Sequence, residues 1–371
     1  MANVPASRLV SLDVFRGVTI ASMILVNNSG SDVTYIPLEH ADWHGWTFTD
    51  TVFPFFLWIV GVAMTLSFAK RIEAGADRGK LLLHSIRRAA IIFGVGLLLA
   101  GLPYFQLDRI RIPGVLQRIA VCYLIAAVIF LYTKIRGQIA FTVFFLVAYW
   151  LLMFYAPVPG FGPGDFSLEG NFEHYVDGLF LTGHMYSRTK TWDPEGIVST
   201  LPAISTALFG VLTGYLLRLR REPAERSTWM FVSGNVLILI GLVLSTWMPI
   251  NKKLWTTSYA VFMAGLAAVS FAICYWLLDG QAGNERWRRI ARPFEIYGKN
   301  AIAVYVLSGL ISKVLYLIQP GGVPLQKIIF DNAFAPLASP INASLLYAIA
   351  NVLVLYGVAW YMNRRGWFVK F

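Results

Sequence analysis

The chain has 371 residues, of which 57% are hydrophobic and only 14% are charged, and its formal net charge is +11. Soluble domains are nearer a quarter charged, so this composition, with a mean hydropathy of +0.60, excludes an ordinary soluble protein and indicates a membrane protein. Most Lys and Arg lie in short segments between apolar runs, as membrane topology favours, so the charge does not indicate nucleic-acid binding.

Apolar runs of about twenty residues recur along the chain, and each is long enough to cross roughly 30 Å of hydrocarbon as a helix. We predict an all-α fold, a polytopic membrane bundle of about ten transmembrane helices in a single domain over residues 1–371. Residues 1–11 lack the apolar core of a signal peptide, so we expect no cleaved signal. The predicted spans are 14–27, 52–69, 89–102, 114–132, 139–155, 198–217, 229–248, 259–278, 300–318 and 344–362.

Basic residues follow every second predicted span, which predicts that these loops and both termini are cytoplasmic in a cell inner membrane. The residues are Lys70, Arg71, Arg78, Lys80, Arg87, Arg88, Lys134, Arg136, Arg218, Arg220, Arg221, Arg226, Arg286, Arg288, Arg289, Arg292, Arg364, Arg365 and Lys370. The link between the first two spans then faces outward, and so does the long loop 156–196. Within that loop, residues 171–184 favour a short amphipathic helix.

The outward link between the first two spans carries titratable groups at a bilayer edge, where they are costly and usually functional. His40 and His44 have the spacing of two metal ligands on a helix, but Gly45 follows and no Glu completes such a site, so we expect no metal. Asp50 opens the second span, where the helix dipole stabilises a carboxylate. It either serves only there, or folds together with Asn27 and His40.

Three polar residues at span ends also need an explanation. Arg118 lies one turn inside the fourth predicted span, where an arginine is expensive unless it meets an anion or a carboxylate. Lys299 and Asn300 place a cation and an amide at the edge of the ninth span. Lys299 either extends to the inner interface or contacts an anion.

Several motifs together resemble the family of heparan-alpha-glucosaminide N-acetyltransferase and its bacterial relatives. The resemblance runs in order from about Arg8 into the last spans. The motifs are Ser11-Leu-Asp-Val-Phe-Arg-Gly17, Val26-Asn27, His40-Ala-Asp-Trp-His-Gly-Trp46, Asp50-Thr-Val-Phe-Pro54, Arg111-Ile-Pro-Gly-Val-Leu-Gln-Arg118 and Thr191-Trp-Asp-Pro-Glu-Gly196. The family implies a transmembrane acyltransferase that moves acetyl from acetyl-CoA to an amino sugar. It places the active histidine on His40, with Asn27 and Asp50 as its partners.

The sequence departs from the family in two ways. His44 stands where the lysosomal enzyme has an asparagine. We also expect this chain to lack the luminal N-terminal part of that enzyme, and therefore to use an acceptor other than heparan. Some relatives have been described as amino-sugar transporters, so transport remains an alternative.

The implied chemistry suits the residues. An amine that attacks a thioester must lose a proton, and a neutral imidazole at His40 can take it or can itself carry the acetyl group transiently. Asp50 would orient the imidazole, and the Asn27 amide would donate to the developing oxyanion. Cations would hold the phosphates of CoA, with Arg118 the first candidate and Lys299 the second, while Asn300 would line the path.

The outer loop offers candidates for the acceptor site. Its acidic residues could bind a protonated amine, and its aromatic residues could stack on a sugar ring or hydrogen-bond to it; alternatively, these are ordinary turn residues and the start of a helix. The candidates are Asp177, His184, Tyr186, Trp192, Asp193 and Glu195.

We therefore predict an N-acetyltransferase acting on a glucosamine-like amine, with an amino-sugar secondary transporter and an O-acetyltransferase of a surface polysaccharide as alternatives. The expected partners are acetyl-CoA as donor, an amino-sugar acceptor and the lipid bilayer. A homodimer is left open, and nucleic acid is excluded.

Overall fold

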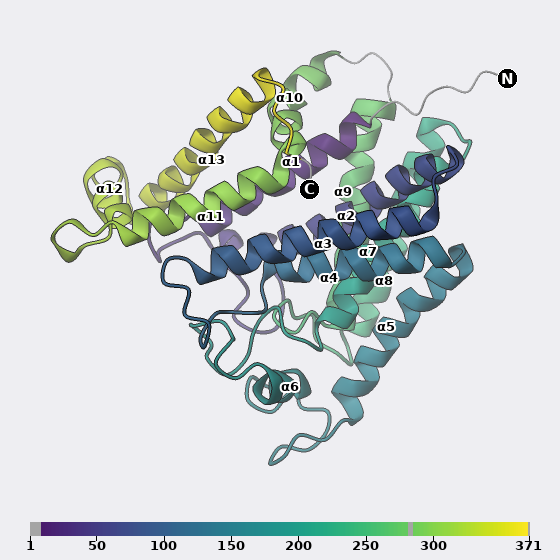
Figure 1. Cartoon of the computed structure of the whole chain (residues 1–371), viewed down its shortest axis with the longest axis horizontal. Helices are drawn as coiled ribbons and strands as arrows, with labels where there is room; N and C mark the ends of the chain where they lie inside the picture. Colours follow the sequence, from purple (N-terminus) through teal and green to yellow (C-terminus); the bar gives the residue numbers. More distant parts are fainter. Residues whose placement is uncertain (1–8, 281–284, 370–371) are drawn as a thin grey trace.

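The computed structural model describes residues 9–280 and 285–369, and within them it contains thirteen α-helices and no β-strand. Figure 1 shows their arrangement. The helices are α1 Val10–Asn27, α2 Phe48–Glu73, α3 Arg78–Gly101, α4 Val115–Tyr132, α5 Ile135–Tyr155, α6 Phe172–Phe180, α7 Thr200–Arg218, α8 Pro223–Leu244, α9 Thr257–Tyr275, α10 Glu285–Lys299, α11 Ala301–Leu317, α12 Leu325–Ala333 and α13 Pro340–Arg364. Three short 3-10 turns and a π-helical turn, Trp276–Gly280, join some of them.

The helices confirm the predicted membrane bundle. In the described part of the chain, nine helices are long and apolar enough to cross a membrane, or up to ten when the bent pair α10 and α11 counts as one span. The two helices of that pair meet at 73°. The protein is therefore a multi-pass membrane protein, as the apolar runs predicted.

Several helices begin earlier than the apolar runs predicted. The helix α2 starts at Phe48 because Thr47 and Asp50 form a capping box at its first turn, which satisfies two backbone N–H groups. The helix α3 starts at Arg78, eleven residues before the predicted boundary of 89, because the Asp77 carboxylate accepts from the Lys80 N–H at 2.9 Å. A hydropathy boundary locates the hydrocarbon edge, whereas a cap locates the end of the helix.

The amphipathic helix predicted over 171–184 is present but shorter. It is α6, Phe172–Phe180, and the Asn171 side chain caps it by accepting from the His174 N–H. Gly183, with φ 86°, lies in the chain that leaves it. The highly charged helix α10 and the short helix α12 were not predicted, because neither has a long apolar run.

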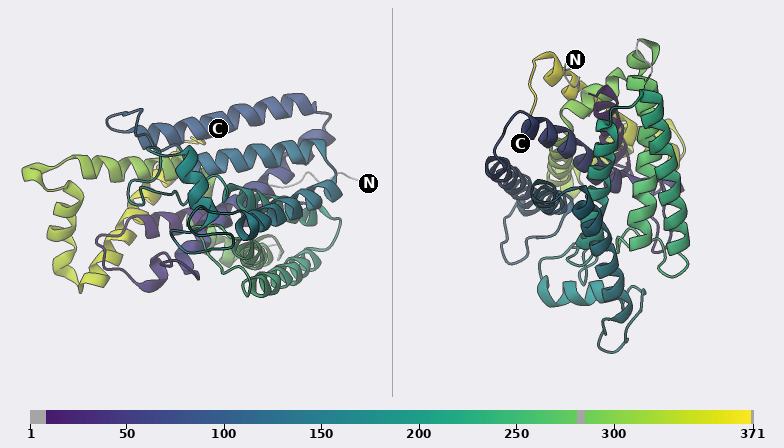
Figure 2. Two further views of the ribbon diagram at one scale, coloured as in Figure 1. Left: turned by 90° about the horizontal axis from the view of Figure 1, so that it is seen from below. Right: turned by 90° about the vertical axis from the view of Figure 1, so that its right-hand side faces the viewer.

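The loops gather at two ends of the bundle. The histidine end, named for His40, holds residues 28–47, 102–114, 156–199 and 245–256, which hydrogen-bond to one another. In Figures 1 and 2, α6 lies beyond one end of the long helices. The other end, called the basic end, carries the arginine-rich segments after α2, α4, α7, α9 and α13.

Glycines allow two helix pairs to touch backbone to backbone. A Cβ added to Gly61 of α2 would lie 1.9 Å from the Ala207 carbonyl oxygen of α7, and one added to Gly17 of α1 would lie 1.7 Å from the Phe294 carbonyl oxygen of α10. Small residues permit such approaches in membrane bundles. These contacts fix α2 and α1, whose ends at the histidine end flank His40.

Candidate active site

A histidine–carboxylate pair lies at the histidine end. His40 Nδ1 is 2.6 Å from Asp50 Oδ1. The Asp50 side chain is 1% exposed, whereas the His40 side chain is 46% exposed. When Asp50 is ionised, Nδ1 carries the ring proton and Nε2 keeps its lone pair. The pair therefore presents a base, oriented by a buried carboxylate, to an accessible space.

Asp50 is held by the start of α2. Its Oδ2 accepts from the backbone N–H groups of Ala41 and Thr47 at 3.1 and 3.0 Å, and its backbone oxygen accepts from the Tyr259 hydroxyl at 2.6 Å. The carboxylate therefore caps the helix and also contacts His40. The predicted grouping of Asp50 with Asn27 is not seen among the described residues.

The loop that carries His40 is fixed along its length. The Thr47 hydroxyl donates to the Glu39 carbonyl at 2.5 Å, and the Thr49 hydroxyl donates to the Pro37 carbonyl at 3.2 Å. Gly45 donates its N–H to the Ile250 carbonyl at 2.7 Å and has a φ of 101°, which favours glycine. These hydrogen bonds hold the loop that carries the His40 ring in place.

An aromatic cluster joins this loop to the long loop after α5. The Trp43 ring packs edge-on against His174 and Trp192, with centroids 5.6 and 5.9 Å apart, and these two rings stack on each other at 4.4 Å. Trp43 also donates its indole N–H to the Phe166 carbonyl at 2.9 Å. Burial lowers the pKa of His174 to about 4, so this histidine is a neutral packing residue.

The motifs 111–118 and 191–196 bind each other. Arg111 holds Asp193 through Nε and Nη2 at 2.8 and 2.6 Å, and its Nη2 also reaches Glu195 at 2.5 Å. Arg118 donates through Nη2 to the Gly196 carbonyl at 3.0 Å and to Ser199 Oγ at 2.5 Å. The two arginines thus bracket the segment before α7. Arg111 was predicted only as part of the motif 111–118, without a role of its own. The two carboxylates in the motif 191–196 were the signal that an arginine could pair with that segment.

A chain of contacts leads from Asp50 to Arg118. The Tyr259 ring, whose hydroxyl contacts Asp50, lies edge-on to Trp255 at 5.4 Å, and the Arg118 guanidinium lies over the Trp255 ring at 5.3 Å. Arg118 is 2% exposed, and its Nε and Nη1 have no hydrogen-bond partner in the described structure. An arginine at a span end is costly unless it meets an anion or a carboxylate, and the hydrogen-bond partners of Arg118 here are a carbonyl and a hydroxyl.

The six predicted acceptor residues divide into two groups. Asp177 and Asp193 are fully buried, and Asp177 accepts from the backbone N–H groups of Asp193 and Ile197. Trp192 is 7% exposed and stacked on His174. These three hold the loop together, as the alternative of ordinary turn residues implied.

The other three comprise two partly exposed residues and one buried carboxylate. His184 is partly exposed and its Nδ1 lies 2.9 Å from the Ile110 carbonyl, while the Tyr186 ring lies under Arg111 at 4.6 Å. Glu195 is 8% exposed. Burial acts to raise the pKa of Glu195, but the charges of Lys252, Arg111 and Arg118 outweigh it and hold the pKa below its usual range. Glu195 is therefore ionised.

A further buried acid was not singled out by the sequence. Glu173 of α6 is fully buried, and neither of its carboxyl oxygens has a hydrogen-bond partner in the described structure. Burial, and then the charge of Asp177, raise the pKa of Glu173 well above its usual range. Burial also raises the pKa of Asp177 to about 6. Glu173 is therefore a neutral acid behind the arginine-bound segment.

The remaining predicted residues do not join the His40 pair. Asn27 is exposed at the end of α1, and in the described structure it forms no hydrogen bond with His40 or Asp50. Lys299 pairs with Glu295 at 2.7 Å at the basic end. Asn300, 1% exposed, donates to the Trp367 carbonyl and accepts from the Val369 N–H, which fixes the chain after α13.

His44 and His40 contact different residues. Its Nδ1 is 3.4 Å from the Asn251 amide nitrogen, and burial lowers its pKa. Across residues 9–280 and 285–369, no group of three or more His, Cys, Asp or Glu side chains is placed to hold a metal ion.

We expect Arg111→Ala to destabilise the protein by about 3 kcal/mol, because it leaves two buried carboxylates without their cation. The measurement is thermal unfolding of the purified protein in detergent. The matched control is Arg109→Ala, which removes an exposed ion pair with Asp108 at 3.5 Å and should cost about 0–1 kcal/mol. Equal unfolding temperatures for the two variants would show that the arginine–carboxylate cluster is not important for stability.

Comparison with known proteins adds two findings. Residues 8–241, more than half of the chain, match the family model described as heparan-alpha-glucosaminide N-acetyltransferase, catalytic. Heparan-alpha-glucosaminide N-acetyltransferase of Mus musculus is 29% identical over 355 residues, covering 81% of this chain and 53% of the relative. The Homo sapiens protein of the same name is 29% identical over 353 residues, covering 81% and 52%. The chain thus spans about half the length of the curated relatives it matches.

Proposed function

Since this chain belongs to the heparan-alpha-glucosaminide N-acetyltransferase catalytic family, we propose that it transfers acetyl from acetyl-CoA to the amino group of a glucosamine-like sugar. The observation that carries the proposal is the contact between His40 and the buried Asp50. Both residues lie in the range matched by the family model. A histidine oriented by a carboxylate is the group that acyl transfer requires.

The reaction assigned to this pair is as follows. The sugar nitrogen attacks the thioester carbonyl carbon, so an N–C bond forms and the C–S bond breaks. His40 Nε2 accepts the proton that the nitrogen loses, and the leaving CoA thiolate takes a proton from the resulting imidazolium, which returns His40 to its neutral form. Asp50 holds the ring and stabilises the imidazolium that forms. The proposed role of Asn27 is to donate an amide N–H to the oxyanion, which requires its exposed side chain to turn towards the substrate.

The imidazole could instead attack the thioester first, which would make an acetyl-histidine intermediate. The exposure of His40 favours direct attack, because an acyl-imidazole next to water would hydrolyse readily. Labelled acetyl-CoA given without sugar should therefore leave the protein unlabelled.

The proposed donor contact is Arg118. Its free Nε and Nη1 donors, together with its link through Trp255 and Tyr259 to Asp50, support binding of an oxygen-rich part of acetyl-CoA close to the reacting carbonyl. Lys299 and Asn300 have protein partners, so they are weaker candidates. The proposed acceptor contacts are Glu195, for the amine, and Tyr186 and His184, for the ring.

A turnover assay tests the function. Purified protein in detergent, given acetyl-CoA and glucosamine, should release free CoA thiol and N-acetylglucosamine in equal amounts. An acceptor lacking the amine, such as glucose, should give no product, which separates N-acetyl from O-acetyl transfer. If no amino sugar of a panel is acetylated while reconstituted protein moves labelled glucosamine across a vesicle, then the protein is a transporter.

A further inference from the structure

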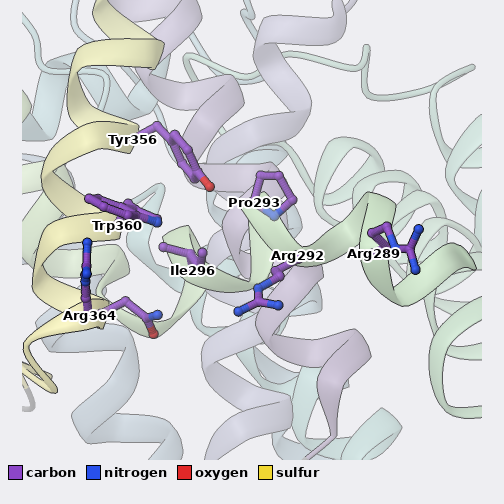
Figure 3. Close-up of a pocket in the computed structure, with 8 residues that line it drawn as sticks. Arg289, Arg292, Pro293, Ile296, Tyr356, Trp360 and Arg364 are labelled. Carbon is purple, nitrogen blue, oxygen red and sulfur yellow. The ribbon is translucent and has the colours of Figure 1, made fainter. Parts of the chain in front are cut away.

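A groove lies between α10 and α13 at the basic end (Figure 3). Its volume is about 470 Å³. Three of the residues that line it are arginines, and none is acidic. They are Arg289, Arg292, Pro293, Ile296, Tyr356, Trp360, Asn363 and Arg364. The groove also lies outside residues 8–241, the range matched by the family model.

The three arginines have no carboxylate partner. In the described ranges, Arg289, Arg292 and Arg364 form no ion pair, although Arg364 lies over the Trp360 ring at 5.4 Å. Other arginines at the basic end are paired, such as Arg218 with Glu73 and Arg221 with Glu225. Three unpaired guanidinium groups around one groove attract an anion, and phosphate oxygens suit their fork of donors.

A second space adjoins the groove along α10. It has a volume of about 500 Å³ and shares Arg289, Arg292, Ile296 and Asn363 with the groove. Two carboxylates line that space, Glu285 and Glu295, and Glu295 is paired with Lys299 at 2.7 Å. Four cationic side chains line it as well, Arg288, Arg289, Arg292 and Lys299, so its charge stays positive.

The groove is closed towards the inside of the bundle. Ile296 is 5% exposed, and the Tyr297 ring, 5.9 Å from the Tyr356 ring, donates its hydroxyl to the Val352 carbonyl. On the other side of α10, a Cβ at Gly298 would lie 1.8 Å from the Asp13 carbonyl oxygen. The groove is therefore backed by packed side chains of α10 and α13.

Each of the two helices that form the groove carries an exposed apolar side chain close to it. Ile290 of α10 is 52% exposed and lies one turn from Pro293, while Leu353 of α13 is 61% exposed and lies one turn from Tyr356. In a membrane protein such exposed side chains contact acyl chains, and Trp360 is a residue type typical of the interface. Basic pockets between helices on the cytoplasmic side bind anionic headgroups.

We propose that the groove between α10 and α13 binds the phosphate of an anionic lipid in the leaflet at the basic end. Arg289, Arg292 and Arg364 surround the phosphate, Trp360 lies beside the headgroup, and the acyl chains lie along Ile290 and Leu353. The site is separate from the proposed acetyl-transfer site, so either can be wrong without the other.

The test compares two short-chain lipids, dioctanoyl phosphatidylglycerol and dioctanoyl phosphatidylcholine, by native mass spectrometry of the full chain in a neutral detergent. The phosphatidylglycerol should bind at least tenfold more tightly, and the preference should weaken as salt is raised. The double variant Arg292→Gln, Arg364→Gln should lose the preference. The matched control Arg78→Gln, Arg220→Gln changes two exposed arginines outside the groove and should keep it.

Three results would overturn the proposal. They are equal binding of the two lipids by the unchanged protein, a preference insensitive to salt, and a preference retained by the groove variant. Displacement of phosphatidylglycerol by acetyl-CoA would instead assign the groove to the CoA phosphates. If the glutamine variant does not fold, then Arg292→Lys, Arg364→Lys should still prefer phosphatidylglycerol, because the charge is kept; loss of preference there would also count against the site.

Discussion

Replacing His40 with alanine is expected to abolish acetyl transfer while the protein remains folded. The ring is half-exposed and, within the described residues, its side-chain hydrogen bond is to Asp50, so little packing is lost. The proposed base or acyl carrier is lost entirely, and general-base catalysis alone contributes about 10²–10⁴-fold. The measurement is the turnover rate with acetyl-CoA and glucosamine, alongside gel filtration and thermal unfolding in detergent.

The neighbouring variants should separate catalysis from structure. Asp50→Asn keeps one oxygen for the helix cap but allows the wrong tautomer of His40, so turnover should fall by about a hundredfold or more with little loss of stability. Asn27→Ala should also lower turnover by about a hundredfold, the size expected for one oxyanion donor. The adjacent Asn28 is buried and bonded to Ser308 and Ser312, so Asn28→Ala should mainly lower the unfolding temperature.

Near-normal turnover in His40→Ala would remove this mechanism. An active enzyme in which Asn27→Ala behaves like the unchanged protein would remove only the oxyanion role, which at present rests on the resemblance. The comparison matters because Asn27 and Asn28 are adjacent in the sequence but have opposite environments. The sequence alone offered no means to distinguish the buried asparagine from the exposed one.

The parts of the fold that sequence reasoning found are those set by local chemistry. Apolar runs identified the spans because burial in hydrocarbon demands them. The pairing of His40 with Asp50 was implied by the family resemblance, whereas the residues alone also allowed Asp50 to serve only at the start of its helix. By contrast, the contact between Arg111 and Asp193 joins residues 82 positions apart, and such a contact depends on how α4 and α7 pack. The same holds for Asp177, which looked like a ligand residue but accepts buried backbone N–H groups.

The basic end shows a second limit. Lys299 and Asn300 attracted attention as polar residues at a span edge, yet Lys299 pairs with Glu295 one turn away, and Asn300 fixes the segment after α13. The unpaired arginines of the groove lie elsewhere on α10 and at the end of α13. Composition reveals that charges are present, but only the packing of α10 against α13 reveals which of them lack partners.

The last prediction is that acetyl transfer crosses the membrane. The positive charges cluster at the end opposite His40, which by the charge rule places the basic end in the cytoplasm and His40 outside. Acetyl-CoA is highly charged and does not cross a bilayer unaided. If His40 is the catalytic group, then the acetyl group must reach it through the helix bundle from the cytoplasmic face.

Sealed vesicles of known orientation test this directly. Labelling with an impermeant thiol reagent determines the orientation. One cysteine replaces Asp32, which is exposed near His40, and another replaces Ala74, which is exposed at the basic end. The two cysteines should label from opposite sides of the membrane. Gly75 is less suitable than Ala74 because its φ is 84°.

With acetyl-CoA only on the basic side and glucosamine only on the His40 side, N-acetylglucosamine should form on the His40 side at a rate close to that in detergent. The His40→Ala protein in the same vesicles is the control and should form none. Arg118→Ala removes the proposed donor contact in the first turn of α4. It should raise the acetyl-CoA concentration needed for half-maximal turnover without changing the glucosamine concentration needed. Product that forms only when both substrates share one compartment would show that the bundle offers no such route, and that the two substrates enter the site from the same face.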